Sequence, residues 1–299
     1  MYKTVALAVD GSEESTHAGT VAAQLGMLKG SAVHLVSAVE EDPVVERGRS
    51  QLNDEERERL RSSHELELAG PARDALAALK DTDLDIAGVE LQEGPPATAI
   101  SEAARKIGAD LVVMGRRGLG AIQRFFLGSV SLKVLELCDR PVLVVPGDFT
   151  PGDATRQVIV APTDFSAESR SGLTHARDLA VLLGAKLVLT YDVQPGVTAD
   201  DLLDSSDRTE LEAKMVDKAS ARLKEIAGEL AKDGLEIKTI VATSEVAGGI
   251  VAVARQQEAT LICMASHGRS GLEKMWLGSF TQAVVKRSHV PVLVVRTRG

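Results

Sequence analysis

The segment Pro141-Val142-Leu143-Val144-Val145 recurs 150 residues later as Pro291-Val292-Leu293-Val294-Val295. The triplet Leu127-Gly128-Ser129 recurs at the same spacing as Leu277-Gly278-Ser279. Earlier in the chain, Asp10 follows an apolar run and matches Asp164, at a spacing of 154. Two copies of so long a unit indicate duplicated domains rather than a solenoid of short repeats.

The junction between the copies is the segment 146–153, which holds two prolines and two glycines in eight residues. Neither a helix nor a strand is expected to cross such a segment. The sequence therefore predicts one domain over 1–147 and a second over 154–299.

Within each copy, short β-branched runs alternate with helical patterns. The first copy predicts helices at 13–28, 53–80, 97–107 and 129–138, and strands at 3–9, 32–39, 86–92, 110–114 and 141–145. The second predicts strands near 157–163, 186–193, 236–242, 260–264 and 291–295. This alternation is typical of the α/β class. We expect two tandem, doubly wound, five-stranded parallel sheets with helices on both faces.

Composition excludes several function classes. The 299 residues carry a net charge of −9, and only 3% are aromatic, without a basic stripe. A nucleic-acid binder is therefore not expected. No apolar run approaches the ~20 residues that span a bilayer, and no signal peptide is evident at the start. The cysteines, Cys138 and Cys263, form neither a disulfide framework nor a metal motif. These features predict a cytoplasmic protein without a metal site.

A glycine-rich loop follows the fourth predicted strand. Gly115, Gly118 and Gly128-Ser129 have the spacing G-x2-G-x9-G-S, between a strand and a helix. Such glycines let the backbone approach a ligand closely, and the free N–H groups of the following helix attract phosphate. Neither a P-loop nor a G-x-G-x-x-G motif occurs, because Gln123 stands where the third glycine of the latter belongs. Two alternatives stay open: single glycines serve ordinary turns, and Asp10 and Asp164 serve as helix N-caps.

The sequence resembles the universal stress protein family in its tandem form, on the two aspartates, the two glycine loops and the repeated closing segments. The resemblance implies a fold like that of the adenine nucleotide alpha hydrolases and a bound ATP or AMP, with or without Mg²⁺. Adenine would lie near the aspartate after the first strand, and ribose and phosphates along the loop. The implied contacts are Ala8, Val9, Asp10, Val39, Met114, Gly115, Arg117, Gly118, Gly128, Ser129 and Val130 in the first copy, and Pro162, Thr163, Asp164, Val193, Met264, Ala265, His267, Gly268, Gly278, Ser279 and Phe280 in the second.

The two copies differ inside this frame. Ala265 stands where the first copy has Gly115, and Phe280 where it has Val130. If the position needs a positive φ or a close approach to the ligand, the extra methyl group costs on the order of 1 kcal/mol. We therefore expect the first site to bind ATP more tightly than the second. Positive charge for a phosphate is offered by Arg116, Arg117, Arg124, His267, Arg269 and Lys274.

The resemblance implies a nucleotide-dependent regulatory module of a stress response. The residues favour a binding module over an enzyme, because no general base or paired carboxylates accompany the loop. A slow ATPase or nucleotidyl transferase on the same fold, and an interaction protein without nucleotide, remain alternatives. An unidentified protein partner is expected. The apolar closing strands 141–145 and 291–295 are expected to pair, within one chain or in a homodimer.

Overall fold

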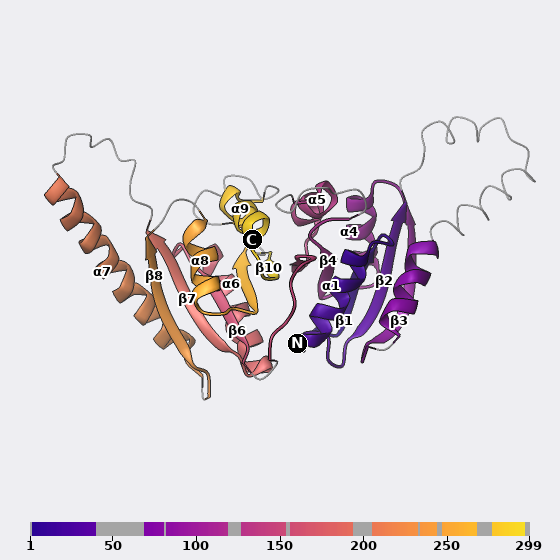
Figure 1. Cartoon of the computed structure of the whole chain (residues 1–299), viewed down its shortest axis with the longest axis horizontal. Helices are drawn as coiled ribbons and strands as arrows, with labels where there is room; N and C mark the ends of the chain where they lie inside the picture. Colours follow the sequence, from indigo (N-terminus) through magenta and orange to yellow (C-terminus); the bar gives the residue numbers. More distant parts are fainter. Residues whose placement is uncertain are drawn as a thin grey trace, which may run out of the picture. The chain divides into compact units, whose positions relative to one another are not determined.

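The computed structural model of the chain describes residues 2–39, 69–80, 82–118, 127–153, 156–193, 205–232, 234–243, 247–267 and 277–296. The chain divides into two compact units, Met1–Thr150 and Pro151–Gly299, here called unit 1 and unit 2. Figure 1 shows the strands of each unit side by side with helices packed against them.

Unit 1 contains one parallel sheet with the strand order β3-β2-β1-β4-β5. Its labelled elements are β1 (Thr4–Val9), α1 (Glu13–Gln24), β2 (Ala32–Val39), β3 (Asp85–Glu93), α4 (Pro96–Lys106), β4 (Leu111–Gly115), α5 (Ser129–Leu137) and β5 (Val142–Val145). Residues 69–79 are also helical.

Unit 2 repeats this plan with the strand order β10-β9-β6-β7-β8, again with parallel pairs. Its elements are β6 (Val158–Pro162), α6 (Ala167–Leu183), β7 (Lys186–Val193), α7 (Ser205–Leu230), β8 (Ile237–Thr243), α8 (Gly248–Gln256), β9 (Leu261–Ala265), α9 (Ser279–Arg287) and β10 (Val292–Val295). The predicted α/β class with five parallel strands in each copy is confirmed.

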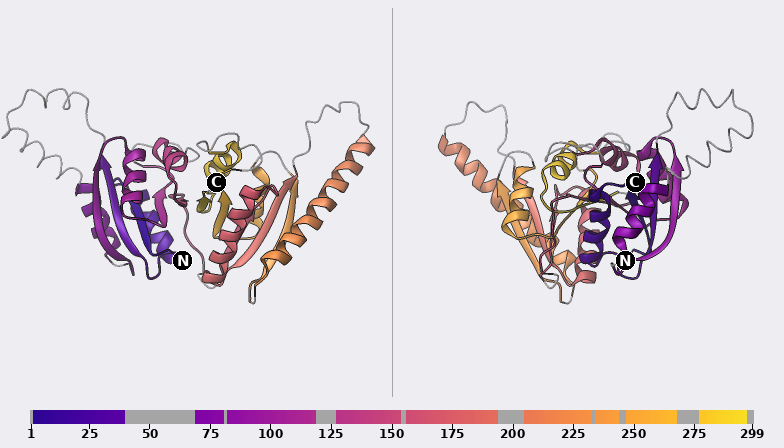
Figure 2. Two further views of the ribbon diagram at one scale, coloured as in Figure 1. Left: turned by 180° about the vertical axis from the view of Figure 1, so that it is seen from behind. Right: turned by 45° about the vertical axis from the view of Figure 1, so that its right-hand side comes forward.

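Helices cover both faces of each sheet, as Figures 1 and 2 show from different sides. In unit 1, α1 packs on β4, whereas α4 packs on β2 and β3 and also contacts α5. In unit 2, α6 packs on β9. After Thr4, the residues of β1 and those of β4 are apolar and buried. Complete burial of a large aliphatic side chain stabilises the fold by about 1.5–3 kcal/mol. Each sheet is therefore a rigid base for the loops at its carboxyl edge.

Several helix bounds differ from those expected. Helix α1 ends at Gln24 rather than at 28, because Leu25 caps it and Gly26 adopts a positive φ of 74°. A left-handed glycine at this point ends a helix and turns the chain. Of the helix expected over 53–80, the first part lies outside the described residues.

Within the described residues, no helix combines the length and the apolar character that crossing a membrane requires.

Candidate functional site

Unit 1 has a cavity of about 620 Å³ where the strand order reverses between β1 and β4. Ligands of open α/β sheets bind at such a point. Ten of the eleven residues expected for this copy line it: Ala8, Val9, Asp10, Met114, Gly115, Arg117, Gly118, Gly128, Ser129 and Val130. The other, Val39, ends β2, but its side chain lies outside the described part of the chain. Six lining residues were not expected: Ser15, Ala38, Pro71, Pro96, Ile100 and Ser131.

Asp10 joins the end of β1 to the start of α1 and to the glycine loop. Its Oδ1 accepts hydrogen bonds from the backbone nitrogen of Ser12 at 3.1 Å and from the Ser12 hydroxyl at 2.5 Å. The N-cap of α1 is Ser12 itself, whose Oγ accepts from Ser15 N. Asp10 therefore orients the capping residue rather than capping the helix directly. Its Oδ2 lies against Gly118, where an added Cβ would be only 2.2 Å away.

The last glycine of the motif starts a helix whose first residues line the cavity. Helix α5 begins at Ser129, after an N-cap Gly128 that makes no side-chain capping hydrogen bond. Ser131 holds the preceding loop, because its Oγ donates to the carbonyl oxygens of Gly115 at 3.0 Å and Arg116 at 3.1 Å. An uncapped helix start with its positive dipole end is a binding site for an anion.

The two loop arginines have different environments. Arg117 lines the cavity, and its Nη2 lies 2.7 Å from Oε1 of Glu14, on α1. Arg116 is only 3% exposed and lies 3.9 Å from Asp148. Burial lowers the pKa of Arg116, an effect that Asp148 opposes. Arg117 is therefore placed to meet a ligand, whereas Arg116 does not line the cavity. Arg124, Arg269 and Lys274 lie outside the described residues.

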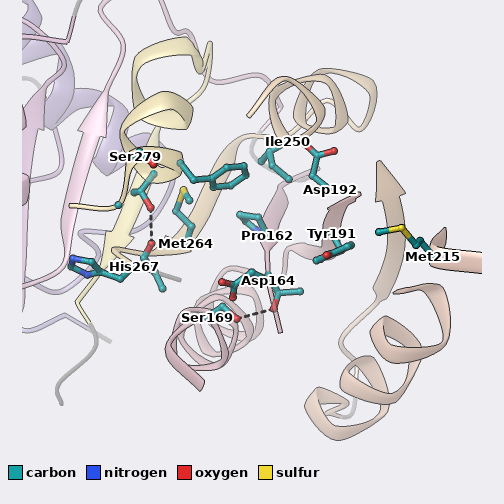
Figure 3. Close-up of a pocket in the computed structure, with 15 residues that line it drawn as sticks. Pro162, Asp164, Ser169, Tyr191, Asp192, Met215, Ile250, Met264, His267 and Ser279 are labelled. Carbon is teal, nitrogen blue, oxygen red and sulfur yellow. Dashed lines mark hydrogen bonds between the residues drawn. The ribbon is translucent and has the colours of Figure 1, made fainter. Parts of the chain in front are cut away.

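Unit 2 has a smaller cavity of about 350 Å³ at the equivalent place, shown in Figure 3. Nine expected residues line it: Pro162, Thr163, Asp164, Met264, Ala265, His267, Gly278, Ser279 and Phe280. Gly268 lies outside the described part, and Val193 lines a neighbouring cavity of about 600 Å³. Six further residues line the cavity of Figure 3: Ser169, Tyr191, Asp192, Met215, Ile250 and Thr281.

The backbone frame of unit 1 is repeated in unit 2. Asp164 Oδ1 accepts from the nitrogen and hydroxyl of Ser166, which caps α6. Thr281 Oγ1 donates to Ala265 O at 3.2 Å, as Ser131 does to Gly115 O. The spacings of 154 and 150 relate Ser15 to Ser169 and Ser131 to Thr281. Extending the repeat comparison to these hydroxyl residues would therefore have found them from the sequence.

Of the two conditions given above for Ala265, the positive φ does not hold. Ala265 is not among the residues with a positive φ. Its methyl group lies next to Gly172 of α6, where an added Cβ would be 3.3 Å from Ala265 Cβ and 2.7 Å from Ala265 N. Unit 1 has the opposite arrangement, Ala18 at the place of Gly172 and Gly115 at the place of Ala265. The exchange of glycine and alanine thus concerns the packing of a helix on a strand.

His267 takes the place of Arg117 in unit 2. Its Nδ1 lies 2.9 Å from the hydroxyl of Ser266, a fully buried side chain. Burial lowers the pKa of His267, and the charge of Arg296 lowers it further, whereas Glu168 opposes this shift. Unit 1 therefore has an arginine at this place, whereas unit 2 has a histidine, whose charge depends on the pH. Among the described residues, no cluster of three His, Cys, Asp or Glu could hold a metal ion.

Comparison with known proteins agrees with this architecture. The model of the universal stress protein family matches residues 1–146 and 155–296. A universal stress protein of Mycolicibacterium smegmatis is 28% identical over 215 residues, which are 70% of this chain and 68% of that protein. One of Thermus aquaticus is 39% identical over 145 residues, 48% of this chain and 99% of that protein.

Among solved structures, a universal stress protein of Archaeoglobus fulgidus superposes with a TM-score of 0.61 at 23% identity. The match covers 98% of this chain and 96% of that one, and at this identity it bears on the fold alone. The two segments matched by the family model, one in each unit, show that the chain belongs to the universal stress protein family.

Proposed function

We propose that the unit 1 cavity binds ATP or AMP and that the protein acts as a nucleotide-dependent regulator of a stress response. One observation carries the proposal: Asp10, the close-packed Gly118 and the uncapped start of α5 converge on one cavity of about 620 Å³. A Cβ at position 118 would lie 2.2 Å from Asp10 Oδ2, so glycine lets the loop pack closely on Asp10 at the cavity. In this proposal the α5 N-terminus and Arg117 hold the phosphates, with Mg²⁺ as a counterion of the triphosphate.

The test uses the full-length chain. Mass spectrometry of freshly purified, denatured protein identifies any co-purified nucleotide, and calorimetry with ATP and AMP, with and without Mg²⁺, measures affinity. We expect binding in the unit 1 cavity. Absence of nucleotide in both experiments would support an interaction protein without nucleotide, whereas turnover of ~1 s⁻¹ or more would indicate an enzyme.

We also propose that ATP binds unit 1 more tightly than unit 2. The support is the contrast between Arg117, which is always charged, and His267, whose lowered pKa leaves it neutral near pH 7. This replaces the argument from Ala265.

The pH dependence of binding should distinguish the two cavities. As the pH falls below the ordinary range of histidine, His267 gains a charge that attracts phosphate, so we expect nucleotide affinity of the unit 2 cavity to rise several-fold between pH 7.5 and 5.5. Calorimetry of wild type and His267→Gln separates this effect from titration of the nucleotide itself. Equal pH slopes for the two proteins would contradict the role of His267. The unit 1 cavity has no histidine among its described lining residues, so it serves as the internal reference.

The remaining proposals concern the cellular location, the domain limits and the assembly of the protein. We place it in the cytoplasm, which is supported by two buried cysteines, Cys138 and Cys263, that remain free thiols. Burial raises the pKa of the Cys263 thiol, which makes it unreactive.

We propose domain limits of 1–147 and 154–299, an unidentified protein partner, and pairing of the closing strands within one chain or in a homodimer. Light scattering after size exclusion distinguishes these assemblies.

A further inference from the structure

Unit 2 has a second cavity, of about 600 Å³, next to the one shown in Figure 3. Tyr191 and Val193, alternate residues of β7, line it from the sheet, and Met215 lines it from α7. Tyr191 and Met215 also line the first cavity, and Figure 3 shows Tyr191 on the side toward Met215. Among the described residues at the start of α9, none lines the second cavity. It is therefore separate from the place proposed for phosphates.

An aromatic stack forms one wall of this second cavity. The rings of Phe165 and Tyr191 both line it, with centroids 4.5 Å apart and an interplanar angle of 20°. Phe165 adopts φ 66°, a left-handed conformation that is rare for a bulky residue. At the spacing of 154, unit 1 has Gly11, with φ 82°, and Ser37 at these places. Unit 2 thus keeps a strained backbone with an aromatic ring at the cavity wall, and such strain is concentrated at ligand sites.

Charged side chains of α7 lie at the rim of the second cavity. Lys218, Arg222 and Glu225 line it and are exposed to solvent. Nη1 of Arg222 lies 2.6 Å from Oε2 of Glu225, so these two charges neutralise each other. Lys218 makes no ion pair within the part of the chain that the structure describes. The rim therefore presents a single positive charge that is not compensated.

We propose that the second cavity of unit 2 binds an aromatic monocarboxylate. The ring of the ligand packs against the Phe165–Tyr191 stack, and its carboxylate pairs with the ammonium group of Lys218. Met215, whose flexible side chain is 42% exposed, adapts to the outline of the ring. A volume of about 600 Å³ and mainly apolar walls with a few polar groups are typical of small-molecule sites. The site is independent of the proposed nucleotide binding.

The chemistry of the lining residues distinguishes this ligand class from others. A polyphosphate is disfavoured, because the rim has one uncompensated cation and the carboxylate of Glu225 repels a multiply charged group. An aliphatic carboxylate lacks the contact between ring faces, and a neutral aromatic lacks the ion pair. Since Lys218 is exposed, its ion pair adds at most several-fold to the affinity, and the packing of the ring supplies most of the rest.

The experiment titrates the full-length chain with three probes by calorimetry: 2-naphthoate, the neutral 2-naphthamide and the aliphatic octanoate. We expect 2-naphthoate to bind with a dissociation constant below about 1 mM. The amide should bind several-fold more weakly, and octanoate about tenfold more weakly. If 2-naphthoate does not bind, or if all three probes bind equally well, the inference fails. Neither result bears on nucleotide binding, which is measured separately.

Variants locate the bound probe, because Phe165 and Lys218 line the second cavity and not the first. Phe165→Gly, which introduces the residue of unit 1 and tolerates the positive φ, should keep the fold and weaken 2-naphthoate binding at least tenfold. Lys218→Gln should remove the preference for the carboxylate over the amide. Lys224→Gln, an exposed control on the same helix that does not line the cavity, should bind as the wild type does. Unchanged affinities in Phe165→Gly and Lys218→Gln would place the probe elsewhere and overturn the inference.

Discussion

Gly118→Val should weaken ATP binding to the unit 1 cavity at least a hundredfold, about 2.8 kcal/mol. A Cβ at this position would lie 2.2 Å from Asp10 Oδ2, far inside van der Waals contact. The carboxylate cannot simply turn away, since its Oδ1 is bonded to the nitrogen and the hydroxyl of Ser12. Either Asp10 leaves its place or the loop moves outward, and both changes destroy the geometry proposed for the nucleotide. Calorimetry with ATP gives the measurement.

The matched control is Gly152→Val, in the segment between the closing strand β5 and β6. A Cβ on Gly152 would meet no atom within 4 Å, and the residue does not have a positive φ. This variant should bind ATP as the wild type does. Both variants should keep their unfolding temperature within a few degrees, because Gly118 lies at the carboxyl edge of the sheet rather than in its core. Unchanged affinity in Gly118→Val would show that ATP binds elsewhere.

Gly172→Ala should lower the free energy of unfolding by about 1–3 kcal/mol, the usual effect of overpacking. The added methyl group would lie 2.7 Å from the backbone nitrogen of Ala265 and 3.3 Å from its Cβ. Because the nearest atom belongs to the backbone of the buried strand β9, no rotation of a side chain relieves the contact. Urea unfolding followed by circular dichroism measures the change.

Gly228→Ala on α7 is the control for replacing glycine by alanine within a helix. A Cβ on Gly228 would meet no atom within 4 Å, so alanine should stabilise this helix by up to about 1 kcal/mol. Adding Ala265→Gly to Gly172→Ala should restore only part of the lost stability, since the contact with the nitrogen remains. If Gly172→Ala proves as stable as Gly228→Ala, the packing argument is wrong.

The strands were predictable because their signal is local. The runs 32–39 and 186–193 were predicted with the bounds that β2 and β7 have, since both are rich in valine and leucine. The end of α1 was not predicted, because the apolar pattern continues past Gln24 to Leu28 while Gly26 turns the backbone. A pattern of side chains does not report the backbone angle that ends a helix.

The site was predictable where residues are close in sequence to a glycine motif or a strand end. Asp10, Gly118 and Ser129 were found in this way. Contacts between distant parts of the chain could not be predicted in this way. Gly172 and Ala265, for example, are separated by nearly a hundred residues and meet only when α6 packs on β9. The sequence therefore related Ala265 to the ligand alone and missed its contact with the neighbouring helix α6.

The complementary placement of glycine and alanine has a consequence for the history of the gene. A crossover that joined α1 of one half to β9 of the other would bring Ala18 against Ala265, two methyl groups where each native unit has one. The reverse chimera would bring Gly172 to Gly115 and leave a void, which also destabilises. Exchange of segments between the two halves is thus penalised in both directions. Selection against such chimeras would keep the two halves distinct at these positions.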